Sequence, residues 1–469
     1  MKRIVWYGLI LMCCGVTQLA AQDFRKVIAV VGELEDSVKL MIAREENQRS
    51  TSVADLRREV DDLRATLEHL KTAQANLAKE QIGIQAAVKP AAQPPATAEV
   101  FPSIKVGILA QTHALSTQEQ MTATQEADPQ YQSHWQRQIY VRRLRVLAGG
   151  NISKSTSFFF DSDAPNIGKV TSTGAKSSTV SMYVQDAYVQ HMFLPELGLV
   201  AGLQLVGFVR NGLQSAATLM ALNYGTYQFL LSGPLDNSVG RDVGFSARGF
   251  LADDRLEYRV GVFSGKSLNF YSPFRSVVRI NYNFLDREKG FFYTGSTLGK
   301  GQILALGGGI DLQSSYRGYG VDAFADMPLF GMGSMTASVS LSHVDGGGSD
   351  VDSTFFTGQI PRQNILFAEA GYYLKDWGLQ PYIKYEGQMV SASVMKQVGA
   401  TSTESLDLQN HLRSGSRYGF GINYFLNGHG VSFKFLYERV LRNRLTLDKK
   451  SWEKASSGEL TFQVQYFAY

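Results

Sequence analysis

The sequence predicts an all-β protein, a 16-stranded antiparallel transmembrane β-barrel preceded by an N-terminal α-helical coiled coil. Three observations predict this fold. From Ser103 onward, apolar and polar residues alternate in segments close to the ~9–11 residues with which a tilted strand crosses a membrane. The connections between these segments alternate between short and long, as in barrels with tight turns at one end. Ahead of the segments, residues 53–84 carry a heptad pattern.

Residues 1–21 are typical of a secretory signal peptide. Basic residues precede an apolar run that is too short to span a bilayer, and small residues up to Ala21 suit a cleavage site. A lipoprotein signal using Cys13 or Cys14 is the alternative, and it is disfavoured because Met12 is not small. Both cysteines of the chain lie in this segment, so the mature protein is expected to use neither disulfides nor thiol chemistry.

The composition excludes other classes of protein. A net charge of +4 on 469 residues, with no clustered basic run, does not indicate a nucleic-acid partner. After the signal, no apolar run approaches the ~18 residues of a membrane helix. A large exported chain with 45 Gly, 22 Tyr and 27 Phe therefore fits a barrel or a large soluble β protein.

Residues 22–88 predict a periplasmic helical segment that forms a coiled coil. The a positions of its heptads are Val53, Val60 and Leu67, and the d positions are Leu56, Leu63, Leu70, Leu77 and Ile84. This spacing favours self-association. The alternative is an amphipathic helix that packs on its own barrel. Residues 89–102 are rich in Pro and Ala and predict a stiff, extended linker.

Residues 103–469 form the predicted barrel. In "SMTASVSLSH", residues 334–343, one face carries Met335, Ala337, Val339 and Leu341, and the other carries Thr336, Ser338, Ser340 and Ser342. The sixteen predicted strands are 103–113, 137–148, 155–164, 180–190, 198–206, 241–251, 256–264, 275–285, 302–312, 317–326, 333–344, 362–374, 379–390, 413–426, 430–440 and 459–469.

The links between these strands support a membrane barrel over a soluble sandwich. Links after even-numbered strands are mostly tight, and include "GNISK", "ADD", "DMPLFGMG", "KDWG" and "NGHG". Links after odd-numbered strands are mostly long, namely 114–136, 165–179, 207–240, 345–361, 391–412 and 441–458. Two links break the rule, because 286–301 is long and 313–316 is short. A transmembrane barrel with short periplasmic turns and long external loops produces such alternation.

The stretch "RQIYVRRLRVLAGG", residues 137–150, fixes the expected orientation of its strand. Arg143 and Arg145 share one face, and Leu144 and Val146 share the other. With lipid outside the barrel, the apolar face points outward and the two arginines line a watery lumen. Arg142 falls on the outward side, so we expect a bulge there or a place near the interface.

Three stretches resemble the phosphate-selective porin O and P family. They are "YVRRLRVLAGGNISKSTSFFFDSDA", "VQDAYVQHMFLPELGLVAGLQ" and "GRDVGFSARGFLADDRLEYRVGVFSGK". The resemblance is clearest from about Ile139 to Asn283. It implies a sixteen-stranded, homotrimeric outer-membrane channel whose third external loop, here 207–240, folds inward as the constriction.

The resemblance also implies where ions would be selected. Phosphate-selective members use arginines and lysines in the constriction and lumen, with tyrosines over them. Around its constriction loop this chain offers Tyr224, Tyr227, Arg210 and Arg241. Alternation along the strands predicts basic pore-lining residues at Arg143, Arg145, Arg248, Arg259, Arg279, Lys384, Arg417 and Lys434. It predicts acidic ones at Asp161, Asp163, Asp186, Asp242, Glu257, Glu369, Glu386 and Glu438. Eight of each predict a mixed lumen with weak ion preference at most.

Three functions follow from these patterns. The first is an outer-membrane porin of a Gram-negative bacterium, with its N-terminal segment in the periplasm, that passes small hydrophilic solutes or anions, phosphate among them. The second is a non-conducting structural protein whose coiled coil contacts periplasmic partners or the cell wall. The third is a barrel enzyme, for which Ser342–His343 is the one adjacent Ser–His pair on a strand. No phosphate loop, zinc spacing or nucleophile elbow occurs, so the expectation is no enzyme, no cofactor and no metal.

Overall fold

A computed structural model describes most of residues 101–469. The segments 123–124, 126–127, 129, 131, 171–173, 178–180, 230–239, 266–272, 347–359, 361, 392–413 and 446–451 lie outside it, as does all of 1–100 except residue 65. The predicted signal peptide, coiled coil and most of the linker therefore lie outside the described residues. Residues 99–469 form one compact unit.

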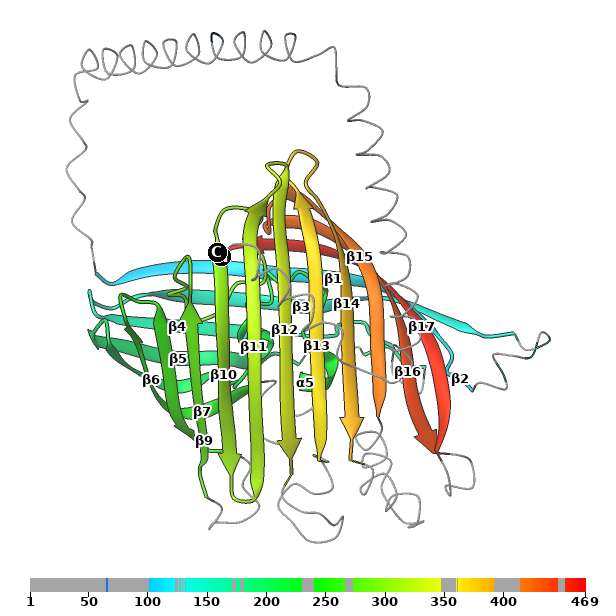
Figure 1. Cartoon of the computed structure of the whole chain (residues 1–469), viewed down its shortest axis with the longest axis horizontal. Helices are drawn as coiled ribbons and strands as arrows, with labels where there is room; N and C mark the ends of the chain where they lie inside the picture. Colours follow the sequence, from blue (N-terminus) through cyan, green and yellow to red (C-terminus); the bar gives the residue numbers. More distant parts are fainter. Residues whose placement is uncertain are drawn as a thin grey trace, which may run out of the picture. The chain divides into compact units, whose positions relative to one another are not determined.

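Sixteen long strands form the wall of this unit within the described ranges (Figure 1). They are β1 (Ser103–Gln118), β3 (Trp135–Asn151), β4 (Thr156–Asp163), β5 (Tyr183–Leu194), β6 (Leu197–Leu205), β7 (Arg241–Leu251), β8 (Leu256–Phe263), β9 (Arg275–Asn283), β10 (Ile303–Gln313), β11 (Tyr316–Leu329), β12 (Gly333–Asp345), β13 (Gln363–Leu374), β14 (Leu379–Val390), β15 (Gly415–Asn427), β16 (Val431–Leu445) and β17 (Trp452–Ala468). A two-residue strand, β2 (Met121–Thr122), pairs with β17. All sixteen predicted strands are confirmed, although several bounds differ: β1 continues to Gln118 and β16 to Leu445.

The sheet is closed and antiparallel. Each long strand pairs with the next one along the chain, and β1 also pairs with β17, with Ile108 opposite Ala468 and Thr117 opposite Glu459. Among the described strands, closure gives each long strand a partner on both sides, which removes the aggregation hazard of an open sheet. The predicted sixteen-stranded antiparallel barrel is confirmed.

The two faces of the wall differ as the period of two predicts. On β14, Ile383 is 65% exposed while its neighbour Lys384 is 4% exposed. On β7, Phe245 is 73% exposed while Arg248 is buried. The outer face is therefore apolar and the inner face carries the charged side chains.

β3 contains a bulge at Arg142, the residue that did not fit the alternation of apolar and polar faces. Arg143 pairs with Gln111 of β1, but Thr112 pairs with Val141, so Arg142 has no opposite residue. The bulge lets Arg143 and Arg145 face inward, where both are buried, while Val146 is 41% exposed on the outside. The bulge expected at Arg142 is thus present.

Two short helices lie in one of the links between strands. The link from β6 to β7 contains a 3-10 helix, η1 (Arg210–Leu213), and one turn of α-helix, α5 (Thr226–Phe229). Among the described residues, no helix has both the length and the apolar character needed to cross a membrane.

Candidate functional site: the interior of the barrel

The described part of the β6–β7 link, residues 206–229, is the first inward segment. It makes hydrogen bonds to strands that are widely separated around the ring, from β9 through β17 to β1. The strand residues involved are Gln111 (β1), Arg279 (β9), Asp322 (β11), Ser340 (β12), Glu386 (β14), Asn423 (β15), Lys434 (β16) and Gln465 (β17). A segment bonded to such widely separated strands must lie inside the barrel, where Figure 1 shows α5.

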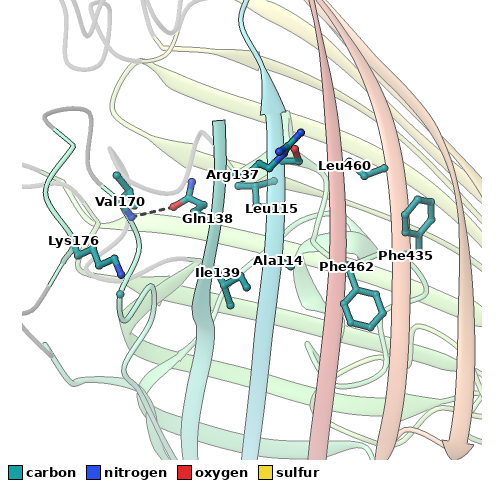
Figure 2. A pocket seen from close by; sticks show the side chains of 12 residues that line it. Ala114, Leu115, Arg137, Gln138, Ile139, Val170, Lys176, Phe435, Leu460 and Phe462 are labelled. Atoms are coloured by element: carbon teal, nitrogen blue, oxygen red, sulfur yellow. Dashed lines mark hydrogen bonds between the residues drawn. The ribbon is translucent and has the colours of Figure 1, made fainter. Parts of the chain in front are cut away.

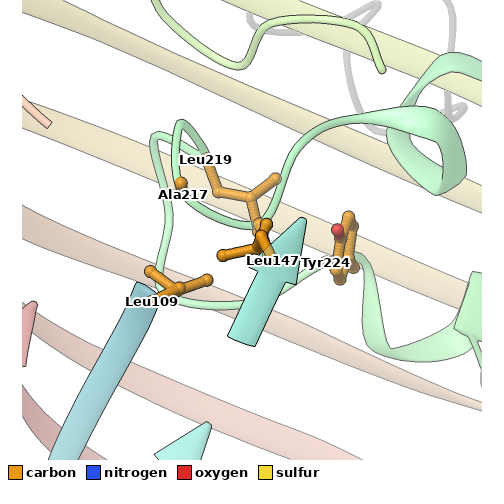
Figure 3. Close-up of a cluster of buried hydrophobic side chains, with 6 residues drawn as sticks. Leu109, Leu147, Ala217, Leu219 and Tyr224 are labelled. Carbon is orange, nitrogen blue, oxygen red and sulfur yellow. The ribbon is translucent and has the colours of Figure 1, made fainter. Parts of the chain in front are cut away.

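Apolar packing fixes this segment against one side of the wall. Leu219 and Tyr224 of the segment pack with Leu109 of β1 and Leu147 of β3, and all four are at most 8% exposed (Figure 3). The Tyr224 hydroxyl donates a hydrogen bond to the carbonyl oxygen of Gln214 at 2.8 Å, which closes the segment on itself. The described part of the loop predicted to fold inward is therefore held by a small apolar core, as well as by polar contacts.

The β9–β10 link, residues 284–302, is the second inward segment. Tyr293 is fully buried, and its hydroxyl donates to Glu257 of β8 at 2.7 Å. Arg248 of β7 donates to the carbonyl oxygens of Lys289 and Gly290 at 2.9 and 2.6 Å. This link is the long one that broke the predicted alternation, and it is long because it enters the barrel.

Most inner charges are neutralised by ion pairs. Arg145 contacts both Asp161 and Asp163 at 3.0 Å, and these three side chains are at most 8% exposed. Arg241, the first residue of β7, pairs with Asp186 at 3.1 Å. The predicted basic and acidic residues on β3, β4, β5 and β7 are thus brought together as ion pairs.

A second cluster surrounds Tyr293. Arg248 and Arg259 both contact Glu257, at 2.6 and 2.9 Å, and Arg279 contacts Asp322 at 2.6 Å. The guanidinium carbons of Arg259 and Arg279 lie 4.8 and 5.2 Å from the centre of the Tyr293 ring. Cation–π contact and charge pairing therefore act on the same side chains.

A third cluster lines β14 to β17. Lys384 contacts Glu386 at 2.6 Å, and Arg417 contacts Glu438 and Glu459 at 2.8 and 2.9 Å. Glu369 of β13 lies directly opposite Lys384 in the strand register and is 5% exposed.

Two further predicted residues lie elsewhere in the interior. Asp242 of β7 accepts hydrogen bonds from the backbone of Val243 and Gly265, and lies 3.6 Å from Arg275. Tyr227 is 4% exposed and its backbone NH donates to Glu386 at 3.4 Å.

Two of the predicted basic pore-lining residues have no ion pair with a carboxylate in the described ranges. Arg143 donates to the Gln111 side chain at 2.7 Å and lies 5.9 Å from the centre of the Tyr224 ring. Lys434 donates to the carbonyl oxygen of Leu219. Their charges are the least compensated among the predicted basic residues.

Several interior residues escaped the sequence-based list. Arg275 and Asp311 pair at 2.6 Å, Asp322 pairs with Arg279, and Glu288 pairs with Arg210. Alternation along β9 could have found Arg275, since Arg279 four residues later was already placed inward. Glu288 lies in a link, where no period of two exists to assign a face.

Two cavities lie between the described parts of the inward segments and the wall. One of about 100 Å³ is bordered by Arg145, Asp161, Tyr224, Arg241 and Phe292, among others. The other, of about 30 Å³, lies between the first inward segment and β6 to β9. Since a water occupies about 30 Å³ of liquid, the larger cavity has room for a few waters.

The outer wall has an apolar hollow of about 690 Å³ where β1, β3, β16 and β17 run side by side (Figure 2). Ile139, Phe435 and Phe462 border it, and Ile139 is 73% exposed. Arg137 and Lys176 provide its charged rim. The hollow lies on the opposite side of the wall from the interior site.

The possible catalytic pair does not assemble. Ser342 is 5% exposed on the inner face of β12, whereas His343 bonds to Asn364 and stacks against the exposed Tyr319. Adjacent strand residues point to opposite faces, so these side chains cannot share a proton. Among the described residues, no group of three metal-ligating side chains could hold a metal ion.

His429, in the turn between β15 and β16, anchors the second inward segment. Its Nε2 lies 2.8 Å from the carbonyl oxygen of Ser296, so the neutral ring must donate there. Its Nδ1 is buried without a hydrogen-bond partner. Burial, together with the positive charges of Lys434 and Lys300, lowers the pKa of His429 to about 4.

We expect this contact to make the barrel less stable in acid. Because the folded pKa of His429 lies below its ordinary value of 6.5, the unfolded chain binds this proton first as the pH falls. The stabilising contribution of His429 is thus complete above about pH 6.5 and is lost towards about pH 4. Urea midpoints at about pH 7.5 and about pH 4.5 should differ more in the wild type than in His429→Gln, which can donate but not titrate. Equal pH dependence in both proteins would contradict this role.

Comparisons with known proteins give similar folds. The outer membrane channel DcaP of Acinetobacter baumannii aligns over 79% of this chain and 99% of its own, at 11% identity and a TM-score of 0.46. The anion-selective porin from Comamonas acidovorans aligns over 78% and 99%, at 9% identity and a TM-score of 0.47. Pseudomonas putida OprB aligns over 77% and 94%, at 9% identity and a TM-score of 0.49. No family model and no curated relative matches the chain. At identities and TM-scores this low, the function has to be inferred from the geometry of this chain itself.

Proposed function

We propose that this chain is an outer-membrane porin through which small hydrophilic solutes diffuse passively. The observation that carries the proposal is the contrast between the two faces of a closed barrel. Apolar side chains such as Phe245 and Ile383 stand exposed on the outside, while charged side chains and two inward segments occupy the inside. An apolar outer band suits lipid, and a polar interior suits a water-filled passage.

We further propose a weak ion preference in place of phosphate specificity. Most inner cations are paired with carboxylates, and opposite charges at about 3 Å largely cancel the field that a passing ion feels. Arg143 and Lys434 are the main exceptions, so they would carry any remaining preference for anions.

Planar bilayer recordings test both statements. The wild type should give a steady conductance and a reversal potential near zero under a salt gradient. Arg143→Gln should move the reversal potential towards cation preference. The shift should be measured at low salt, because at physiological ionic strength the charge is screened over ~8 Å. Arg317→Gln is the matched control, since Arg317 is exposed on the outer face of β11, beside the buried Tyr316, and should change nothing. Folded protein that carries no current would overturn the porin proposal.

One observation favours a second candidate, a non-conducting structural barrel. The two inward segments contact the wall widely, and the cavities described between them and the wall are about 100 and 30 Å³. In that case the periplasmic coiled coil would be the functional part, linking the barrel to the cell wall or to periplasmic partners. Absence of current from correctly folded protein would support this candidate. The homotrimer stays a prediction because the structure contains one chain, and the coiled coil stays one because all of residues 22–88 except residue 65 lie outside the described part.

A further inference from the structure

We infer that the second inward segment, 284–302, is a second constriction element, and that Phe292 is a specificity-determining residue that limits the size of solutes. The inference rests on the proposed porin function. It goes beyond the first inward segment, 206–229, because it assigns a share of the size limit to a link from the other end of the barrel.

The topology shows that the two inward segments enter from opposite ends. Successive links of an antiparallel barrel alternate between its ends, and the β6–β7 and β9–β10 links are separated by three strands. A much shorter link suffices for closure, since residues 252–255 join β7 to β8. The extra length of the β9–β10 link therefore serves something other than joining two strands.

The two segments are joined to each other inside the barrel. The Tyr293 NH donates to the carbonyl oxygen of Leu213, and the Ser215 NH donates to that of Tyr293, both at 2.9 Å. Arg210 makes a bidentate ion pair with Glu288 at 2.7 and 2.9 Å, and Arg210 is fully buried. Backbone pairing plus a buried bidentate pair fixes the distance between the segments.

Phe292 lies at the border of one of the cavities between the inward segments and the wall. Its ring contacts that of Phe159 on β4, with centroids 5.4 Å apart, and it borders the cavity of about 100 Å³. Arg145, Asp161 and Arg241 border the same cavity. A solute on this route would pass between charged groups of the wall and the Phe292 ring, so removal of the ring should widen the passage directly.

Phe292→Ala tests the inference, with Phe330→Ala as the matched control. Phe330 is the same residue type in the turn after β11, and it is 76% exposed, away from the interior. In liposome swelling with uncharged sugars of increasing size, Phe292→Ala should raise the uptake of the largest admitted sugars several-fold. Its single-channel conductance should also rise. Phe330→Ala should match the wild type in both measurements.

A second variant keeps the test decisive if Phe292→Ala fails to fold. Glu288→Gln weakens the Arg210 pair and should produce excursions to a larger conductance, as the segments separate. Lys289→Gln is its control, because Lys289 and Asp254 form a largely exposed pair in the same region. No current from the wild type would refute the porin proposal itself. Wild-type current that is unchanged in both Phe292→Ala and Glu288→Gln would overturn this inference alone.

Discussion

Arg145→Met is expected to lower the stability of the folded barrel by about 3–5 kcal/mol, the usual cost of removing one partner from a buried ion pair. Asp161 and Asp163 would then face each other, buried at 2% exposure each, without their shared cation. One oxygen of Asp161 already lacks a hydrogen-bond partner, so the site has little capacity to compensate. Urea unfolding in lipid vesicles, followed by heat-modifiable gel mobility, measures the loss.

A rescue variant separates charge from packing. Arg145→Met combined with Asp161→Asn and Asp163→Asn removes all three charges and should recover most of the lost stability, since neutral replacement of a buried ionic cluster is often tolerated. If Arg145→Met unfolded at the wild-type urea concentration, water would have to reach the two carboxylates freely. The interior near β3 and β4 would then be an open aqueous lumen, and the ion pairs there would contribute little.

Ile383→Arg is expected to make the free energy of insertion into lipid less favourable by about 2–4 kcal/mol, the cost of a basic side chain facing the bilayer midplane. Ile383 lies in the middle of β14 and is 65% exposed on the outer face. In water, an exposed Ile-to-Arg change would be nearly neutral, so the size of the effect tells a membrane barrel from a soluble one. Folding yield into vesicles, read from heat-modifiable mobility, is the measurement.

Two variants serve as controls, one at Ile383 itself and one at its neighbour Lys384. Ile383→Leu should insert normally because the lipid face stays apolar. Lys384→Arg should also insert, because Lys384 is buried on the inner face and the positive charge beside Glu386 is kept. Normal insertion of Ile383→Arg would show that this wall does not contact the hydrocarbon core, which would remove the main support for the porin proposal.

The sequence alone predicted the wall of the barrel well, for a physical reason. Side chains alternate between the two faces of a strand, so the face of Arg145 or of Val146 follows from local order once one face is known to be apolar. All sixteen strands were predicted on this basis, and the predicted charged residues on the strands are at most half-exposed on the inner side. The bulge at Arg142 was one of the two placements expected, because a lone arginine on the outer face conflicts with the pattern.

The partners of these residues were decided only by the tertiary structure. The three-way contact of Arg145 with Asp161 and Asp163 depends on the register between β3 and β4, which the pattern within one strand does not specify. Eight basic and eight acidic residues suggested a mixed lumen, whereas the register turned most of them into pairs. Compensation of charge is a property of neighbouring strands, and alternation describes one strand at a time.

The paths of the links were decided in the same way. Residues 284–302 stood out in the sequence only as a link of unexpected length, and nothing local indicated that Tyr293 would be fully buried against Leu213, or that Glu288 would pair with Arg210. A link has no periodic face, and its position depends on the space that the closed barrel leaves and on contacts with residues distant along the chain. The sequence therefore determined which residues face inward along the strands, and the closed structure determined which of them meet and what fills the space between them.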